Sequence, residues 1–520
     1  MRAGRLSWLL PILLVSAGCS AGGGRITGSG NPDGAGGDGF VPPRTDPLPP
    51  VSANCTHFVA PGGDDDGGGG PAAPWRTLKR AASSAKPGNV VCARAGVYAG
   101  AVVIEVSGTQ DAPIVFRSFP GETAIVDGGG LSPSSDEQMF LVEGRSWITI
   151  AGFEIRNLRT TRRGTVAGFW VTDGAHHVQI RDNDVHHIET RAGSDGNAHG
   201  IAIHQHSDSA SIHDVAIDGN KVHDLKLGAS EAVVVNGNVT AWQITNNEIH
   251  DNDNIGIDAI GYEGTGAESD RAREGTIAGN LVYANDSFGN PAYGSSRSAG
   301  CIYVDGGAKI VIERNVVRAC NIGIEIASER GGKYASDIVV RSNFISANTE
   351  AGISLGGASS SNGGTERCSF VNNTLFQNDT RNGGTGEIQF QYNTRDNVLK
   401  NNLFFASKQG LFIGSSSNAM SGNVVDSNLY WTAGGGEGSW KWKGKDHDTV
   451  TAYRAATGND AASIFAVDPL LVDDTGKDLH LRRGSMAANK GAVLAASGSV
   501  DIDGDVRQKD ATDIGADELR

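Results

Sequence analysis

The stretch ITNNEIHD (244–251) decides the fold, because its pattern of alternating apolar residues, an asparagine and another short apolar run keeps returning. Aligned positions in successive copies lie 27 to 37 residues apart. A period of this length is typical of a solenoid, in which each repeat stacks on the one before it. The nine copies are IAGFEIRN (150–157), IRDNDVHH (180–187), IDGNKVHD (217–224), ITNNEIHD (244–251), IAGNLVYA (277–284), IERNVVRA (312–319), VRSNFISA (340–347), VNNTLFQN (371–378) and LKNNLFFA (399–406).

The apolar residues of the repeat favour strands over helices. They alternate with a period of two and are mostly β-branched, and no apolar period of 3.6 residues runs between the copies. The recurring asparagine suits a tight bend, since Asn tolerates a left-handed backbone. Stacked on successive coils, these side chains can form a hydrogen-bonded ladder. We therefore expect an all-β solenoid, the parallel β-helix.

Each coil carries a second strand-like run. The runs are HGIAIHQH (199–206), EAVVVNGN (231–238), IGIDAIGY (255–262), GCIYVDGG (300–307), IGIEIASE (322–329) and AGISLGGA (351–358). Alternation places one set of side chains in the core and the other on the outer face. The predicted inward set is Ile201, Ile203, Val233, Val235, Ile257, Ile302, Val304, Ile324, Ile326, Ile353 and Leu355.

With these repeats, the chain resembles the right-handed parallel β-helix proteins of the pectate-lyase-like superfamily over roughly residues 55–430. Residues 58–100 are similar to their N-terminal cap, which implies a short capping helix at about residues 75–85. Residues 468–518 resemble their C-terminal exit segment. The predicted organisation is a signal peptide (1–18), a tether (19–53), a cap with the first coils (54–130), the β-helix (131–430) and an exit or capping segment (431–520).

The N-terminus predicts export. Arg2 and Arg5 precede an apolar run at 6–15 that is too short to cross a bilayer as a helix. The following SAGC (16–19) resembles a bacterial lipobox, which makes Cys19 the expected lipidation site. The Gly- and Pro-rich residues 19–53 predict a flexible tether. We expect a cell-envelope protein, lipid-anchored to a bacterial membrane or simply exported.

Export permits disulfides between the other five cysteines. A Cys55–Cys92 bridge would join parts of the N-terminal cap, and Cys301 and Cys320 would lie about one coil apart. Cys368 is left over, and burial in the core is its expected role.

The charge balance limits the partners. The formal net charge is -15, and a bare acidic surface repels nucleic acid, whose phosphates need Lys or Arg. A polyanionic glycan would need a local basic patch or bridging Ca²⁺. The expected partner is a polysaccharide or oligosaccharide, besides the membrane.

Acidic side chains gather on the outward positions of the second strands. These catalytic candidates are Asp258, Asp305 and Glu325. Neighbouring coils are about 4.8 Å apart, so the carboxyl groups of Asp305 and Glu325 could approach about 5 Å, as in retaining glycosidases. The pair resembles that of the retaining β-xylosidases built on a β-helix, which implies Asp305 as nucleophile and Glu325 as acid/base, or the reverse. This hydrolysis would require no cofactor.

The alternative chemistry is calcium-dependent β-elimination. The stretch HDNDNIGIDAIG (250–261) resembles the calcium cluster of one pectate-lyase family, which implies Asp251, Asp253 and Asp258 as ligands. The sequence departs from that family at Asn254-Ile255, where acids are expected, and at Tyr303, where a lysine base is expected.

The predicted substrate contacts surround the acids. They are His204, Asn236, Tyr303, Arg330 and Lys333, with the segments 263–274 and 286–299 as walls of a cleft. A surface protein that binds a glycan or partner through the same face, without catalysis, is the third interpretation.

Overall fold

The computed structural model describes residue 44 and residues 48–520, apart from residue 416. The predicted signal peptide, Cys19 and most of the tether lie outside these residues. All described residues belong to one compact unit, so the predicted boundaries at 130 and 430 subdivide that unit. Among the described residues, no helix is both long and apolar enough to cross a membrane.

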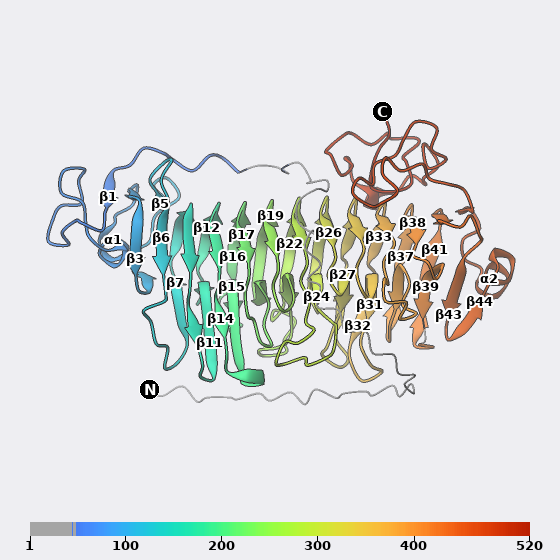
Figure 1. Ribbon diagram of the computed structural model, residues 1–520, viewed down its shortest axis with the longest axis horizontal. Helices are drawn as coiled ribbons and strands as arrows, with labels where there is room; N and C mark the ends of the chain where they lie inside the picture. The colour runs from blue at the N-terminus through green and yellow to red at the C-terminus, as the bar shows by residue number, and fades with distance from the viewer. Residues whose placement is uncertain (1–43, 45–47, 416) are drawn as a thin grey trace, which may run out of the picture. The chain divides into compact units, whose positions relative to one another are not determined.

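The described chain winds into a right-handed parallel β-helix, as predicted, with three strands in each coil (Figure 1). One coil consists of β16 (Ile212–Asp218), β17 (Lys221–His223) and β18 (Val233–Gly237). Each strand pairs in parallel with its counterpart one coil later. We name the three sheets that contain β16, β17 and β18 sheet 1, sheet 2 and sheet 3.

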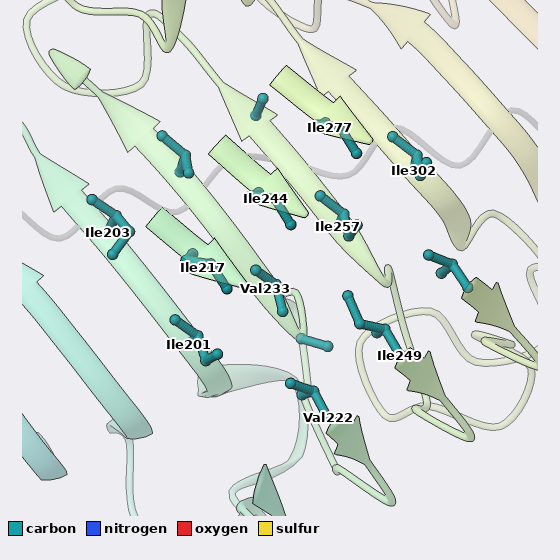
Figure 2. Packing of buried hydrophobic residues seen from close by; sticks show 14 of the residues in the cluster. Ile201, Ile203, Ile217, Val222, Val233, Ile244, Ile249, Ile257, Ile277 and Ile302 are labelled. Carbon is teal, nitrogen blue, oxygen red and sulfur yellow. The ribbon is translucent and has the colours of Figure 1, made fainter. Parts of the chain in front are cut away.

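The core lies between the three sheets. Figure 2 shows Ile201 and Val233 from sheet 3, Ile217 from sheet 1 and Val222 from sheet 2 pointing into one interior. Burying a side chain of this size stabilises the fold by about 1.5–3 kcal/mol. All eleven residues predicted to point inward are at most 1% exposed, which confirms the alternation in sheet 3.

The predicted asparagine ladder is present between sheets 1 and 2. The backbone N–H and the Nδ2 of Asn247 donate to Oδ1 of Asn280 at 2.9 and 3.0 Å. The same Nδ2 donates to the carbonyl of Ile217 at 3.0 Å, so each side chain also satisfies the backbone of an earlier coil. The ladder comprises Asn183, Asn220, Asn247, Asn280, Asn315, Asn343, Asn373, Asn402 and Asn428.

The ladder asparagines do not themselves adopt the left-handed backbone, which corrects the sequence prediction. The left-handed residue is the one before, as at Asn246 (φ 58°), Arg314 (φ 57°) and Ser342 (φ 51°). That residue turns the chain from sheet 1 to sheet 2. The asparagine after it can then point inward, where its amide bonds to buried backbone groups.

Both N- and C-terminal ends of the solenoid are covered. Helix α1 (Leu78–Ser84), capped by the Thr77 side chain, confirms the predicted N-terminal helix. At the other end, Trp440 of β43 (Ser439–Trp442) stacks on Tyr453 of helix α2 (Val450–Thr457), and both aromatic rings are buried.

The exit segment folds back over the outer face of sheet 2, where its apolar side chains pack on residues such as Phe405. Figure 1 shows it in dark red beside β38 (Leu403–Ala406). Arg507 anchors it through a buried ion pair with Glu518, 3.2 Å long, and a hydrogen bond to Ser342. The segment therefore covers a side of the β-helix, while β43 and α2 close its end.

Both predicted disulfides form, Cys55–Cys92 and Cys301–Cys320, and Cys368 is a buried free thiol. The second bridge interrupts another ladder of polar side chains. Cys320 donates its backbone N–H to Oδ1 of Asn348 at 3.0 Å, as an asparagine would at that position. The bridge ties this rung to β24 (Gly300–Asp305).

Candidate active site

The predicted catalytic acids lie on the outer face of sheet 3. Asp258 of β21 (Ile257–Ile260) pairs with Tyr303 of β24, and Tyr303 pairs with Glu325 of β27 (Ile322–Ala327). Asp305, two residues after Tyr303, lies opposite Ala327. The outer face thus holds a row of Asp258, Tyr303 and Glu325, with Asp305 beside it.

The register refines the placement of Asp305 and Glu325. The two are on neighbouring coils but not opposite each other. A strand spacing of about 4.8 Å and a rise of about 3.3 Å per residue put their Cα atoms roughly 8 Å apart. The residue that meets Asp305 directly is Glu329, whose backbone N–H donates to Asp305 Oδ1 at 2.7 Å.

Six carboxyl groups form the candidate site. Asp258 and Asp305 are at most 5% exposed, Glu231 and Glu325 are half-buried, and Glu263 and Glu329 are exposed at the rim. Among the described residues, these six groups make one ion pair, between His199 and Glu231 at 3.7 Å. The site is therefore a cluster of carboxyl groups that no Lys or Arg side chain pairs with among the described residues.

Burial and mutual repulsion raise the pKa values in this cluster. Burial is the main cause of the raised pKa of Asp305, followed by the charges of Glu329 and Glu263. Burial likewise raises the pKa of Asp258, followed by the charges of Glu231 and Asp305. The pKa of Glu325 rises to about 8, from burial and from Glu329. Part of the cluster is therefore protonated at neutral pH.

Several buried polar atoms in the site lack a hydrogen-bond partner among the described residues. They are Oδ1 of Asp258, Oδ1 of Asn236 and Nε2 of His204. Asn236 uses its Nδ2 to bind Oε2 of Glu263 at 2.7 Å, and His204 packs on Trp170 with ring centroids 4.5 Å apart. Buried polar groups are normally satisfied, so these atoms are poised to contact a polar ligand.

Two tyrosines also face the acids. Burial and the nearby carboxylates raise the pKa of Tyr303, so its hydroxyl stays protonated and can donate. The pKa of Tyr293 rises for the same reasons. Tyr293 lies in the segment 286–299, which was predicted to be a cleft wall. Nδ2 of Asn290 fixes this segment by donating to the backbone carbonyls of Gly228 and Asp253 at 2.8 and 2.9 Å.

The two predicted basic contacts lie at the edge of the site. Lys333 donates to Glu268 at 2.7 Å and lies over the ring of Tyr262, 4.7 Å from its centroid. Arg330 is exposed beside them. Neither Arg330 nor Lys333 pairs with the buried acids. A substrate contact by these two basic residues would therefore be at the edge of the site.

The structure does not bring the predicted calcium ligands together. Asp251 lies in the turn after β20 (Glu248–His250) and pairs with Nδ1 of His250 at 2.6 Å. Asp253 accepts the backbone N–H of Leu227 at 2.6 Å, whereas Asp258 faces outward from sheet 3.

Carboxylate oxygens suit Ca²⁺ chemically, but a cage needs several of them around one point. Among the described residues, no three of the six clustered acids hold their oxygens within 4.8 Å of one another. The structure therefore does not bring Asp251, Asp253 and Asp258 together as one ligand set among the described residues.

Three acids of the cluster were not predicted as site residues. Glu231 and Glu329 stand at the ends of the quoted runs EAVVVNGN and IGIEIASE, outside their alternating cores. Glu263 opens an insertion. Position beside the outward row was the signal that could have identified them.

In a comparison with known protein families, residues 57–300 match the family model described as "Pel9A-like, right handed beta helix region". Residues 296–446 match the model "Right handed beta helix region". The uncharacterized protein YwoF of Bacillus subtilis (strain 168) is 39% identical over 432 residues, which are 83% of this chain and 91% of YwoF.

Two solved structures are also similar. Pectate lyase Pel9A superposes with a TM-score of 0.44 at 13% identity, covering 90% of this chain and 98% of its own. The complex of XylC with xylose gives a TM-score of 0.48 at 12% identity, covering 89% and 98%.

Proposed function

This chain belongs to the right-handed parallel β-helix family that includes YwoF of Bacillus subtilis, and from that premise we propose that it hydrolyses a glycosidic bond on the outer face of sheet 3. The observation that carries the proposal is the cluster of carboxyl groups around Asp305, buried without a cationic partner. Pel9A and XylC are glycan-related by name, and a polysaccharide or oligosaccharide is the proposed substrate.

Glycoside hydrolysis needs one ionised carboxylate and one protonated carboxyl group. We assign the first role to Asp305, because the N–H of Glu329 favours its ionised form and opposes the burial that raises its pKa. Glu325 suits the second, because a pKa of about 8 keeps it protonated at neutral pH. Asp258, on the coil before Asp305, would remain protonated and donate a hydrogen bond to the sugar.

In the proposed reaction, Asp305 attacks the anomeric carbon and the bond to the leaving oxygen breaks, while Glu325 gives that oxygen its proton. Glu325 then takes a proton from water, and the resulting hydroxide displaces Asp305 from the glycosyl ester. Configuration is retained by these two displacements. Glu329 would position Asp305 through the backbone hydrogen bond.

The alternative of calcium-dependent β-elimination has less support. It needs a base near the sugar, and Lys333 is held by Glu268 and Tyr262. Tyr303, which stands where a lysine base was expected, has its pKa raised rather than lowered. A basic side chain would lower the pKa of the neighbouring acids, and these pKa values are raised.

Mass spectrometry of products from xylans, pectins and alginate, with and without chelator, tests the proposal. We expect saturated products that are unaffected by chelator. Unsaturated products lost on chelation would instead establish the lyase. Tight glycan binding without any product would establish the non-catalytic surface protein.

We further propose that the protein works in the cell envelope, anchored through lipid on Cys19. The two disulfides support an oxidising compartment. A Cys19→Ser variant should move from the detergent-rich to the aqueous phase in detergent partitioning. An unchanged distribution would contradict the lipid anchor.

A further inference from the structure

Sheet 1 carries a cluster of three histidines, away from the acids of sheet 3. His176 begins β12 (His176–Arg181), and its partner in the parallel register is His213 of β16. The two imidazole rings stack at 4.9 Å between centroids, with 5° between their planes. One coil therefore presents an imidazole directly beside that of the next.

His177 joins this pair because of its backbone. Consecutive residues of a regular strand point to opposite faces, so His176 and His177 would diverge. The left-handed conformation of His177 (φ 52°) keeps both rings on the outside, with Nδ1 of each 2.9 Å apart. Trp147, left-handed one coil earlier (φ 59°), stacks on His177 at 3.7 Å and fixes its ring.

Asp214 completes the arrangement at the same position on the following coil. Its carboxylate is 2.6 Å from Nδ1 of His213 and 3.5 Å from Nε2 of His177. A carboxylate that contacts a ligating imidazole fixes the ring's orientation and raises its basicity. The cluster thus has orienting groups on two sides, Trp147 and Asp214.

The three histidines can contribute one nitrogen each, and these nitrogens lie within 4.8 Å of one another. The cluster also borders a groove of about 460 Å³ on sheet 1, which leaves room for water or substrate at an open coordination position.

We propose that His176, His177 and His213 bind a divalent first-row transition ion of the zinc type, with Asp214 as orienting group or fourth ligand. Imidazole nitrogen is a preferred donor for zinc, copper and nickel. The site is independent of the proposed hydrolase and would place an ion beside the groove.

The neighbouring sheet supplies a matched control. His186 of β13 (Asp184–His186) and His223 of β17 also stack on adjacent coils, at 5.2 Å, and His187 follows His186. There, however, both nitrogens of His223 are occupied, by Asp184 at 3.0 Å and Asp224 at 2.7 Å. This second set does not form a group of three available nitrogens within 4.8 Å in the described chain.

Titration of the full, chelator-treated chain with ZnCl₂ in a calorimeter tests the proposal. We expect one zinc ion per chain, and a loss of affinity of at least about tenfold in His213→Ala. His223→Ala should bind zinc as the parent does. Circular dichroism of each variant without metal establishes that it is folded.

Cobalt supplies a second readout, since Co²⁺ in a site of nitrogen donors absorbs visible light and the free ion does so only weakly. The parent and His223→Ala should show these bands, and His213→Gln should lose them. Absence of zinc binding by the parent would overturn the proposal. Equal losses in His213→Ala and His223→Ala would also overturn it, because binding would then come from scattered surface histidines.

Discussion

The backbone N–H of Glu329 donates to Oδ1 of Asp305 at 2.7 Å, so the turn after β27 holds a carboxyl group that belongs to the coil before it. The bond limits the rotation of a side chain that is otherwise surrounded by like charges. Two successive coils therefore position one carboxyl group of the proposed active site.

Asp305→Asn should abolish turnover and leave the fold intact. The amide oxygen of Asn can still accept the Glu329 N–H, but an amide cannot act as the nucleophile. We expect kcat to fall by at least about 10³-fold, measured on the glycan identified in the product screen.

Asp251→Asn is the matched control for that change, because Asp251 lies in the turn after β20, outside the cluster. Its kcat should stay within about twofold of the parent value. Full activity in Asp305→Asn would remove Asp305 from the mechanism.

The activity should depend on the protonation of Glu325. Its pKa of about 8 means that the general acid loses its proton as the pH rises through 8. We expect kcat to decline above that pH, in rates recorded between pH 5 and 10. In Glu325→Gln the residual activity should be low and should no longer show this alkaline decline.

Glu387 should make the fold less stable at alkaline pH. Glu387 is fully buried at the end of the ladder that runs through Cys320, Asn348 and Asn378, and its carboxyl group accepts hydrogen bonds from Asn378. Burial raises the pKa of Glu387 from a usual 4.5 to about 8. A carboxyl group with a raised folded pKa stabilises the fold fully below pH 4.5, and this contribution is lost as the pH rises through 8.

Thermal unfolding between pH 5 and 9 checks this effect. The parent Tm should fall across the interval, and the fall should be smaller in Glu387→Gln, whose side chain does not titrate. An identical pH dependence in both proteins would show that Glu387 does not contribute.

Asn280→Ala should destabilise the β-helix by about 3 kcal/mol. The change leaves the backbone N–H and the Nδ2 of Asn247 without their acceptor in a buried position, and each such loss costs about 1–3 kcal/mol. Denaturant unfolding measures the change. Thr240→Ala, on the exposed surface of sheet 1, should cost less than about 1 kcal/mol.

Removing the Cys301–Cys320 bridge should also lower stability. Its sequence separation of 19 residues corresponds to about 3 kcal/mol in the chain-entropy description. We expect a double Cys→Ala variant to unfold at correspondingly lower denaturant. Hydrogen exchange should increase most in β24, and a uniform increase along the chain would contradict a local role.

The fold could be predicted from the repeat, because strands and turns are specified by residues that are close together in the sequence. Alternating Ile and Val specify strands, and an asparagine that recurs every coil specifies a ladder. The capping helix followed from the resemblance of residues 58–100 to the N-terminal cap of these β-helix proteins, and the disulfides followed from expected export and the positions of the cysteines. The side on which the exit segment packs was not predictable, since it depends on long-range contacts such as the hydrogen bond from Arg507 to Ser342.

The candidate site was only partly predictable, for a geometric reason. Alternation placed Asp258, Asp305 and Glu325 on one face, but register decides which of them meet. Glu325 lies opposite Tyr303, and a loop residue, Glu329, reaches Asp305 instead. Contacts supplied by loops of unequal length do not follow from a strand pattern.

The asparagine ladder gives the protein a form of evolutionary freedom. Every rung makes the same side-chain hydrogen bond, whether successive rungs are 26 or 37 residues apart in the chain. The exposed parts of the segments 263–274 and 286–299 lie outside this ladder, so changes there leave its hydrogen bonds in place. Related proteins can therefore differ in these loops while the β-helix keeps the same fold.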